Sequence, residues 1–242
     1  MDSKKFDRIS GTVILVGMTV AIIVATTLKI AAEGAGARTG LMVLSGFGAV
    51  CGVASTVLAA AGNIWTFLFG LLDVSIYSYV LFDNGMWSQF ALHVLYFVPM
   101  QFVGYFSWRK KGAGSDSPVR AERMKARDWV FTLGFFTAVF IAMGWLSYFL
   151  GKNAGDEILP GKICLDAAIT SANITALILM ARAFLEQWYL WILVNVCSIT
   201  IWSLQLSNGY TIVILIKYIF YLLNSLNAVR IWKKLSAPDL EK

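Results

Sequence analysis

The chain has 242 residues, of which 58% are hydrophobic and only 14% are charged, and its formal net charge is +6. A soluble domain carries about 25% charged residues. Here the apolar residues are gathered in runs of about 20, the length that crosses a bilayer as a helix. This arrangement favours one all-α membrane domain over a soluble domain with a tail. Because the basic residues lie mainly between and after the runs, membrane topology explains the positive charge better than nucleic-acid binding does.

Eight apolar segments are predicted to cross the membrane as helices. They cover residues 11–32, 40–61, 63–82, 87–108, 129–150, 163–183, 187–206 and 210–232. The first resembles a signal peptide, but it is too long for a typical signal-peptide core, so we expect an uncleaved helix. Only Gly62 and Asn63 separate the second segment from the third. A single bent helix at that point would reduce the number of spans to seven.

The orientation follows from the distribution of lysine and arginine. The segment after the fourth span is the most basic and is expected to be cytoplasmic. With eight spans both termini are cytoplasmic too, and both ends of the chain carry lysines. The connections around Glu33 and around Asp156 and Glu157 then lie outside. The basic residues of the fourth connection are Arg109, Lys110, Lys111, Arg120, Arg123, Lys125 and Arg127.

A weak internal repeat appears when the chain is shifted by 124 positions. Asn84-Gly85 then falls on Asn208-Gly209, and Trp108 falls on Trp232. The shift maps spans two to four onto spans six to eight and leaves span five as a linker, so the two units are parallel repeats. The predicted division is a tail with an accessory helix (1–36), a first repeat (37–109), a loop with the linker helix (110–160), a second repeat (161–235) and a cytoplasmic tail (236–242).

Several polar and aromatic residues are predicted to lie at bilayer depth, where they are costly and are candidates for function. In span seven, Trp188 and Asn195 are seven positions apart and share one helical face, which continues to Trp202. Such a face can stack a flat ring and hydrogen-bond its substituents, and a cationic ring gains further from aromatic faces. The candidate substrate-binding residues are Asp73, Tyr77, Gln101, Asn173, Trp188, Trp191, Asn195, Tyr221 and Asn224.

Structural roles remain open for these and other polar residues. Amides in membrane helices often only join helices by hydrogen bonds. Asp73 could be the structural partner of Lys217, and Glu186 is expected to be solvated near a loop. Tryptophans near span ends usually form the interfacial belt. That assignment applies to Trp65, Trp87, Trp108, Trp129 and Trp232.

No motif of an enzyme or of a metal site is found. The chain has no Walker A loop, H-E-x-x-H motif or G-x-S-x-G elbow. Its three cysteines form no C-x-x-C pair, and His93 is the only histidine, so neither a metal nor a cofactor is expected. A retinal-binding protein with Lys217 as its Schiff base is disfavoured, because Val213 stands where an aspartate would be expected.

The run Trp188-Tyr-Leu-Trp191-Ile-Leu-Val-Asn195 resembles the W-x-x-W-x-x-x-N signature of the PnuC nicotinamide riboside transporters. The segment from Gln89 to Trp108 and the segment from Lys217 to Asn224 are also similar to that family. The resemblance covers roughly residues 40–235 and leaves the first span outside the shared core.

This resemblance implies a SWEET-like pair of three-helix bundles joined by one helix, in a bacterial inner membrane. It implies facilitated diffusion of nicotinamide riboside, a vitamin B3 nucleoside used in NAD biosynthesis, which a cytoplasmic kinase then traps. Two alternatives stay open: transport of another nucleoside or a sugar, and a scaffold or receptor without transport. The expected partners are this substrate and membrane lipid, without nucleic acid. We also consider a homo-oligomer, a trimer in particular, which no residue pattern determines.

Overall fold

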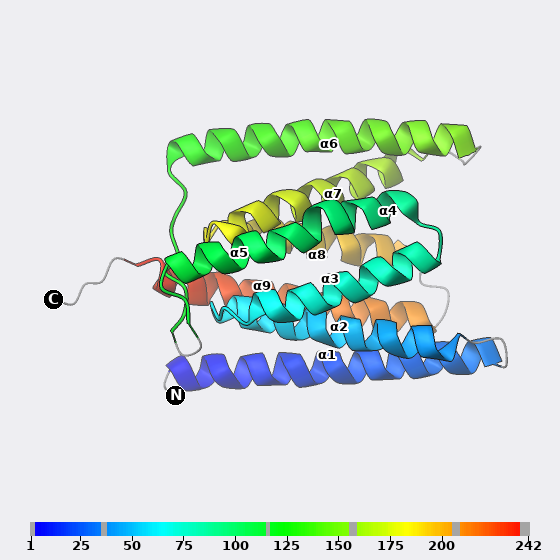
Figure 1. Cartoon of the computed structure of the whole chain (residues 1–242), viewed down its shortest axis with the longest axis horizontal. Helices are drawn as coiled ribbons and strands as arrows, with labels where there is room; N and C mark the ends of the chain where they lie inside the picture. The colour runs from blue at the N-terminus through cyan, green and yellow to red at the C-terminus, as the bar shows by residue number, and fades with distance from the viewer. Residues whose placement is uncertain (1–2, 35–37, 115–116, 155–158, 205–208, 238–242) are drawn as a thin grey trace.

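The computed structural model describes residues 3–34, 38–114, 117–154, 159–204 and 209–237. Within these ranges the chain is helical (Figure 1), and an isolated bridge between Glu122 and Phe184 is the only β-type pairing. The helices are α1 (Ser3–Glu33), α2 (Thr39–Ala60), α3 (Thr66–Asp83), α4 (Trp87–Leu92), the π-helical turn η2 (His93–Phe97), α5 (Val98–Lys110), α6 (Ala126–Ala154), α7 (Pro160–Ala181), α8 (Gln187–Leu204) and α9 (Gly209–Leu235).

These elements coincide with the eight predicted spans, the fourth being α4, η2 and α5 together. Seven of the described helices are long and apolar enough to cross a membrane, and α9 is aligned with them in the bundle without being one of the seven. The prediction of two helices in residues 40–82 is confirmed, because α2 ends at Ala60 and α3 begins at Thr66. The breaks expected at Asp156, Glu157 and Asn208 lie outside the described residues.

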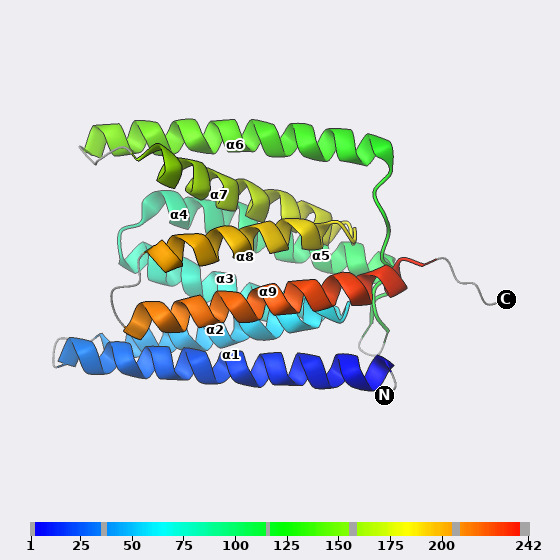
Figure 2. The ribbon, with the colours of Figure 1, turned by 180° about the vertical axis from the view of Figure 1, so that it is seen from behind.

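The helices form one bundle with α1 and α6 on opposite edges (Figures 1 and 2). Helix α1 packs against both α2 and α9, whereas α6 packs against α7 alone among the described helices. Inside the bundle α2 contacts α3 and α9, α5 contacts α3 and α7, and α8 contacts α7 and α9. Helix α1 begins, α5 ends, α6 begins and α9 ends at the same end of the bundle, which we call the terminal end (Figure 1).

The fourth span is widened by the π-helical turn η2. Pro99 has no N–H to bond the carbonyl of Leu95, and its ring crowds that carbonyl, so a regular α-helix cannot continue here. The backbone N–H of Val98 instead bonds the carbonyl of His93, five residues back. In this turn the Tyr96 hydroxyl donates to the carbonyl of Ile174 at 2.6 Å, which joins the fourth span to α7.

The α2–α3 and α7–α8 turns share one geometry. Gly62 and Ala183 both have a left-handed backbone, with φ of 70° and 55°. Each follows a helix end closed by two reverse bonds, Gly62 N–H to Ala59 and Asn63 N–H to Leu58 in the first turn. The same two bonds recur 121 positions later, where the alanine is less suited than glycine to this backbone.

Two tryptophans tie the ends of these helices together. The Trp108 indole donates to the carbonyl of Met180 at 2.6 Å, and the Trp232 indole donates to the carbonyl of Ala59 at 3.1 Å. Both rings have 0% exposure, so the prediction that they belong to the interfacial belt is wrong. They supply donors to the last turns of α7 and α2, where backbone carbonyls lack partners within their own helix. Trp65 and Trp87, by contrast, are exposed.

The α5–α6 connection (residues 111–125) crosses the terminal end and binds both turns through its backbone. Val119 N–H donates to Gly62 and Glu122 N–H donates to Ala183, each at 2.9 Å. The carboxylate of Glu186 accepts a bond from Met124 N–H at 3.1 Å and is buried, so the expectation of a solvated Glu186 is wrong. The connection and the two turns are therefore joined by hydrogen bonds and close this end of the bundle.

Candidate functional site

A central cavity of about 300 Å³ lies between α2, α3, α5, α7, α8 and α9. Its size falls at the lower end of the range for small-ligand sites. Seven of the nine predicted site residues line it, and they come from both halves of the chain. They are Asp73, Gln101, Asn173, Trp188, Trp191, Asn195 and Tyr221.

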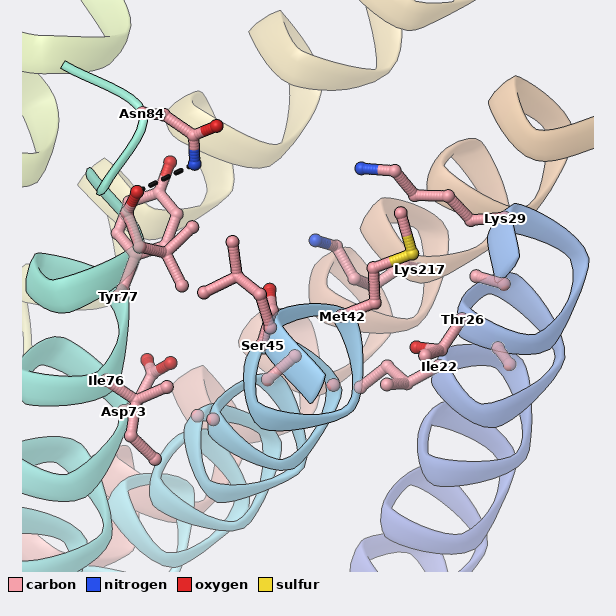
Figure 3. A pocket seen from close by; sticks show the side chains of 18 of the residues that line it. Ile22, Thr26, Lys29, Met42, Ser45, Asp73, Ile76, Tyr77, Asn84 and Lys217 are labelled. Atoms are coloured by element: carbon pink, nitrogen blue, oxygen red, sulfur yellow. Dashed lines mark hydrogen bonds between the residues drawn. The ribbon is translucent and has the colours of Figure 1, made fainter. Parts of the chain in front are cut away.

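A wider vestibule of about 810 Å³ lies next to this cavity, between α1, α2, α3 and α9 (Figure 3). It lies on the side of the cavity that faces away from the terminal end. The side chains of Asp73, Tyr77, Lys217 and Lys29 surround this space from three of these helices. The two cavities are adjacent, because five residues line both. These are Gly52, Asp73, Asn173, Tyr218 and Tyr221.

Asp73 is the only charged residue among the described residues that line the central cavity. Its carboxylate lies over α2 at a glycine: a Cβ added to Gly52 would come 2.6 Å from Asp73 Oδ2. Gly52 therefore leaves room for the carboxylate between two packed helices. A carboxylate at this depth that belongs to neither described ion pair favours a cationic ligand, because charge pairing is strong where water is scarce.

The Gln101 amide is placed in a similar way. A Cβ added to Gly70 would come 2.5 Å from Gln101 Oε1 and 3.1 Å from the Ser55 hydroxyl. The Gln101 amide nitrogen donates along its own helix to the carbonyl of Phe97 at 3.3 Å, a long bond. The side chain is buried and borders the cavity, so its amide can exchange this bond for one with a ligand.

Asn195 lies on the opposite wall. Its amide nitrogen donates to the Ser225 hydroxyl at 3.1 Å, and that hydroxyl donates to the carbonyl of Tyr221 at 2.9 Å. The chain of bonds joins α8 to α9 and fixes the orientation of the Asn195 amide, whose oxygen remains as an acceptor. Asn195 thus has a structural contact and a cavity position at once.

Trp188 is more deeply buried than a ring that only stacks on a ligand would be. Its side chain is 2% exposed and packs on the Trp232 ring, with the ring centres 6.0 Å apart and an angle of 67° between the planes. Its indole N–H is buried and has no hydrogen-bond partner among the described residues. A buried unpaired donor that borders a cavity is costly unless a ligand or water accepts from it. Trp191, one turn further along α8, is only partly buried and also lines the cavity.

Two predicted site residues do not line the central cavity. Tyr77 borders the vestibule alone, as does Trp202 at the end of the α8 stripe. Asn224 borders neither cavity; it is buried, and its amide donates to the carbonyl of Thr56 at 3.2 Å, which joins α9 to α2. The two described ion pairs are Arg38 with Asp83 and Lys111 with Glu122; Lys217 and Asp73 form no such close pair, although their charges interact at longer range.

The sequence patterns missed several residues of the cavity wall. Serine and threonine are common in membrane helices, and nothing in their spacing sets these apart. Tyr218 had a usable signal, since it is adjacent in sequence to Lys217 and lies one turn before Tyr221 on the same helix. The missed lining residues with polar or aromatic side chains are Ser55, Thr56, Phe97, Ser198, Tyr218 and Ser225.

A multi-pass helical bundle that encloses a polar and aromatic cavity, with a vestibule toward one end and packed turns at the other, has the architecture of a membrane transporter. Comparison with known proteins agrees with this class. Residues 42–234 match the family model described as nicotinamide mononucleotide transporter. The chain belongs to this family.

Individual relatives support the same assignment. The chain is 34% identical over 201 residues to the nicotinamide riboside transporter PnuC of Neisseria mucosa, covering 79% of this chain and 72% of the relative. It is 32% identical over 188 residues to that of Haemophilus influenzae, covering 77% of each. The crystal structure of the vitamin B3 transporter PnuC aligns with a TM-score of 0.60 at 28% identity, over 90% of this chain and 91% of the other.

Proposed function

We propose that this chain takes up nicotinamide riboside by facilitated diffusion, with alternating access between two three-helix repeats and later trapping by phosphorylation. The observation that carries the proposal is the central cavity, which Asp73, Gln101 and Asn195 line together with Trp191 and Tyr221. The ligand has a flat pyridinium cation, a carboxamide and ribose hydroxyls. Aromatic faces and a carboxylate suit the cation, and side-chain amides suit the other groups.

The charge of the cavity favours the riboside over its phosphorylated form. The described residues that line the central cavity include one carboxylate, Asp73, and neither lysine nor arginine. A phosphate group in this cavity would meet a negative charge, and the nearest described lysine, Lys217, lines the adjoining vestibule rather than the cavity itself. The family model is named for the mononucleotide, whereas the relatives are named for the riboside. For this chain the lining supports the riboside.

Equivalent contacts at the terminal end support two repeats that move relative to each other. The matching turns at Gly62 and Ala183 and the reciprocal bonds of Trp108 and Trp232 place the same features in both halves. We infer that they close the cytoplasmic side while the vestibule stands open to the outside. Release inward would then require these bonds to break, as alternating access demands.

Uptake into proteoliposomes tests the proposal. With purified protein, no kinase inside, and valinomycin with equal potassium on both sides to hold the membrane potential at zero, labelled nicotinamide riboside should enter saturably and stop at equal concentrations on both sides. An uncoupler should change nothing, whereas kinase and ATP inside the vesicles should produce accumulation. Uptake that collapses with the uncoupler would contradict facilitated diffusion. Efficient competition by the mononucleotide would contradict the assignment of the riboside.

The alternatives predict different results in a binding assay. A transporter for another nucleoside or a sugar should give ligand-dependent tryptophan quenching with that compound and none with nicotinamide riboside. A scaffold or receptor should show no ligand-dependent thermal shift with any compound of the panel, while Asn195→Leu lowers stability by removing the bond to Ser225.

The chain is a multi-pass membrane protein, and we place it in a bacterial inner membrane with both termini cytoplasmic.

Replacing Gly70 by alanine should weaken ligand binding without unfolding the protein. The new methyl would take the space of the Gln101 amide oxygen, which lies 2.5 Å from its position, and would turn the amide away from the cavity. The loss of one or two ligand hydrogen bonds predicts an affinity about three- to tenfold lower. Binding by tryptophan fluorescence checks this. Gly134→Ala in α6 is the matched control, because nothing lies within 4 Å of its Cβ position; unchanged affinity of Gly70→Ala would contradict the role of Gln101.

A further inference from the structure

Lys217 lies about two turns from the start of α9, inside the length of a predicted membrane span, where a lysine is costly. It borders the vestibule, and neither of the two described ion pairs includes it. Its ammonium lies instead over two aromatic rings. The nitrogen is 5.1 Å from the centre of the Tyr218 ring and 6.0 Å from that of Tyr221, distances at which a cation is attracted to the face of a ring.

The same two tyrosines belong to the ligand pathway. Tyr218 and Tyr221 line both the vestibule and the central cavity, and so does Asp73. A cationic ligand that moves from the vestibule toward Asp73 therefore passes the rings with which the Lys217 ammonium already interacts. Two positive charges close to the same ring repel each other, and the repulsion is large where water is limited.

We propose that the Lys217 ammonium competes with the cationic ring of the substrate for the faces of Tyr218 and Tyr221. This competition lowers the preference of the site for a cationic over a neutral ligand of the same shape. The inference rests on the proposed function and adds a residue that opposes binding to those that favour it. A cationic ligand gains from Asp73 and has to displace the ammonium, whereas a neutral ligand of the same shape does neither. The lysine thus limits the affinity for the cationic ligand, so that a cation bound at the Asp73 carboxylate can still dissociate.

The competition has a consequence that a lysine donating a hydrogen bond to the ligand would not have. Removal of the ammonium should strengthen the binding of the cation and leave a neutral isostere unaffected. Nicotinamide riboside and its 1,4-dihydropyridine form provide such a pair, because they share the carboxamide and the ribose and differ in the charge of the ring. Lys217→Met keeps the length and apolar volume of the side chain, and Lys217→Arg keeps its charge.

The dissociation constants of both forms are measured with the full-length protein for wild type, Lys217→Met, Lys217→Arg and Lys29→Met. We expect Lys217→Met to bind the cation about tenfold more tightly and the neutral form within about twofold of wild type. Lys217→Arg should resemble wild type. Lys29→Met removes another vestibule cation, carried by α1, and should change neither value.

Three results would overturn the inference. One is weaker or equal binding of the cation by Lys217→Met, and another is an equal change for both forms. The third is the same tightening in Lys29→Met, which would indicate a general field of the vestibule instead of competition at the two rings. If wild type binds neither form, the proposed function fails and the inference fails with it; if wild type binds the cation and Lys217→Met behaves as in the first two results, only the inference fails.

Discussion

Asp73→Asn should weaken the binding of nicotinamide riboside by about ten- to a hundredfold. The carboxylate is the only charge among the described residues of the central cavity, and the substituted amide keeps its shape but cannot balance a cation. One charge pair at about 4 Å contributes a few kcal/mol where the effective dielectric constant is about 20, and part of this is offset by lost hydration. Equilibrium binding and initial uptake rates should fall together.

The uncharged ligand and a second carboxylate supply the controls for this variant. Asp73→Asn should bind the neutral 1,4-dihydropyridine form nearly as well as wild type does. Asp166→Asn in α7 changes a carboxylate that lines neither cavity and should leave both affinities unchanged. An equal loss for the charged and the neutral ligand would show that Asp73 acts through the shape of the cavity and not through its charge.

Trp188→Ala should destabilise the protein severely. The ring is 2% exposed and lies in the core that contains Trp232, Trp108 and Phe67, so its removal leaves a large void. Large-to-small changes of this kind cost about 3–5 kcal/mol in soluble proteins. A steep fall of the thermal unfolding temperature in detergent is the expected result. Loss of binding by this variant would therefore not identify a ligand contact.

Trp188→Phe separates the ligand contact from the packing. It keeps an aromatic ring in the core and deletes the indole N–H, which has no partner in the part of the chain that the structure describes. If that N–H donates to the substrate, the affinity should fall about three- to tenfold while most of the stability remains. Trp145→Phe on the exposed side of α6 is the control for a lost indole. Normal binding by Trp188→Phe would contradict a donor role.

The helices and much of the cavity wall were predictable from local patterns. Hydropathy located all eight segments, since a span needs a long apolar run whatever its neighbours are. The seven-residue spacing of Trp188 and Asn195 predicted a shared face, and both residues border the central cavity. Periodicity works here because it depends on one helix alone.

Contacts between helices were not predictable in the same way. A tryptophan at a helix end can face lipid or a neighbouring helix, and sequence position alone does not distinguish Trp65 from Trp108. Asn224 was predicted to bind the substrate, yet its partner is a carbonyl of α2, 168 positions earlier in the chain. Gly52 and Gly70 leave room for side chains of other helices, so their importance depends on a packing that no single segment encodes.

The packing of α1 against its neighbours has a consequence for the rate of transport. This helix lies outside the segment matched by the family model, yet it contacts both α2 and α9, and its Gly17 approaches the Phe220 ring closely enough that a Cβ would lie 3.1 Å from it. If the two repeats alternate, α2 and α9 change their separation, and α1 has to slide along at least one of them. The size of the side chain at position 17 would then affect the turnover rate, because a larger side chain would hinder this sliding at Phe220. The ligand affinities of the outward-facing and inward-facing states would stay the same.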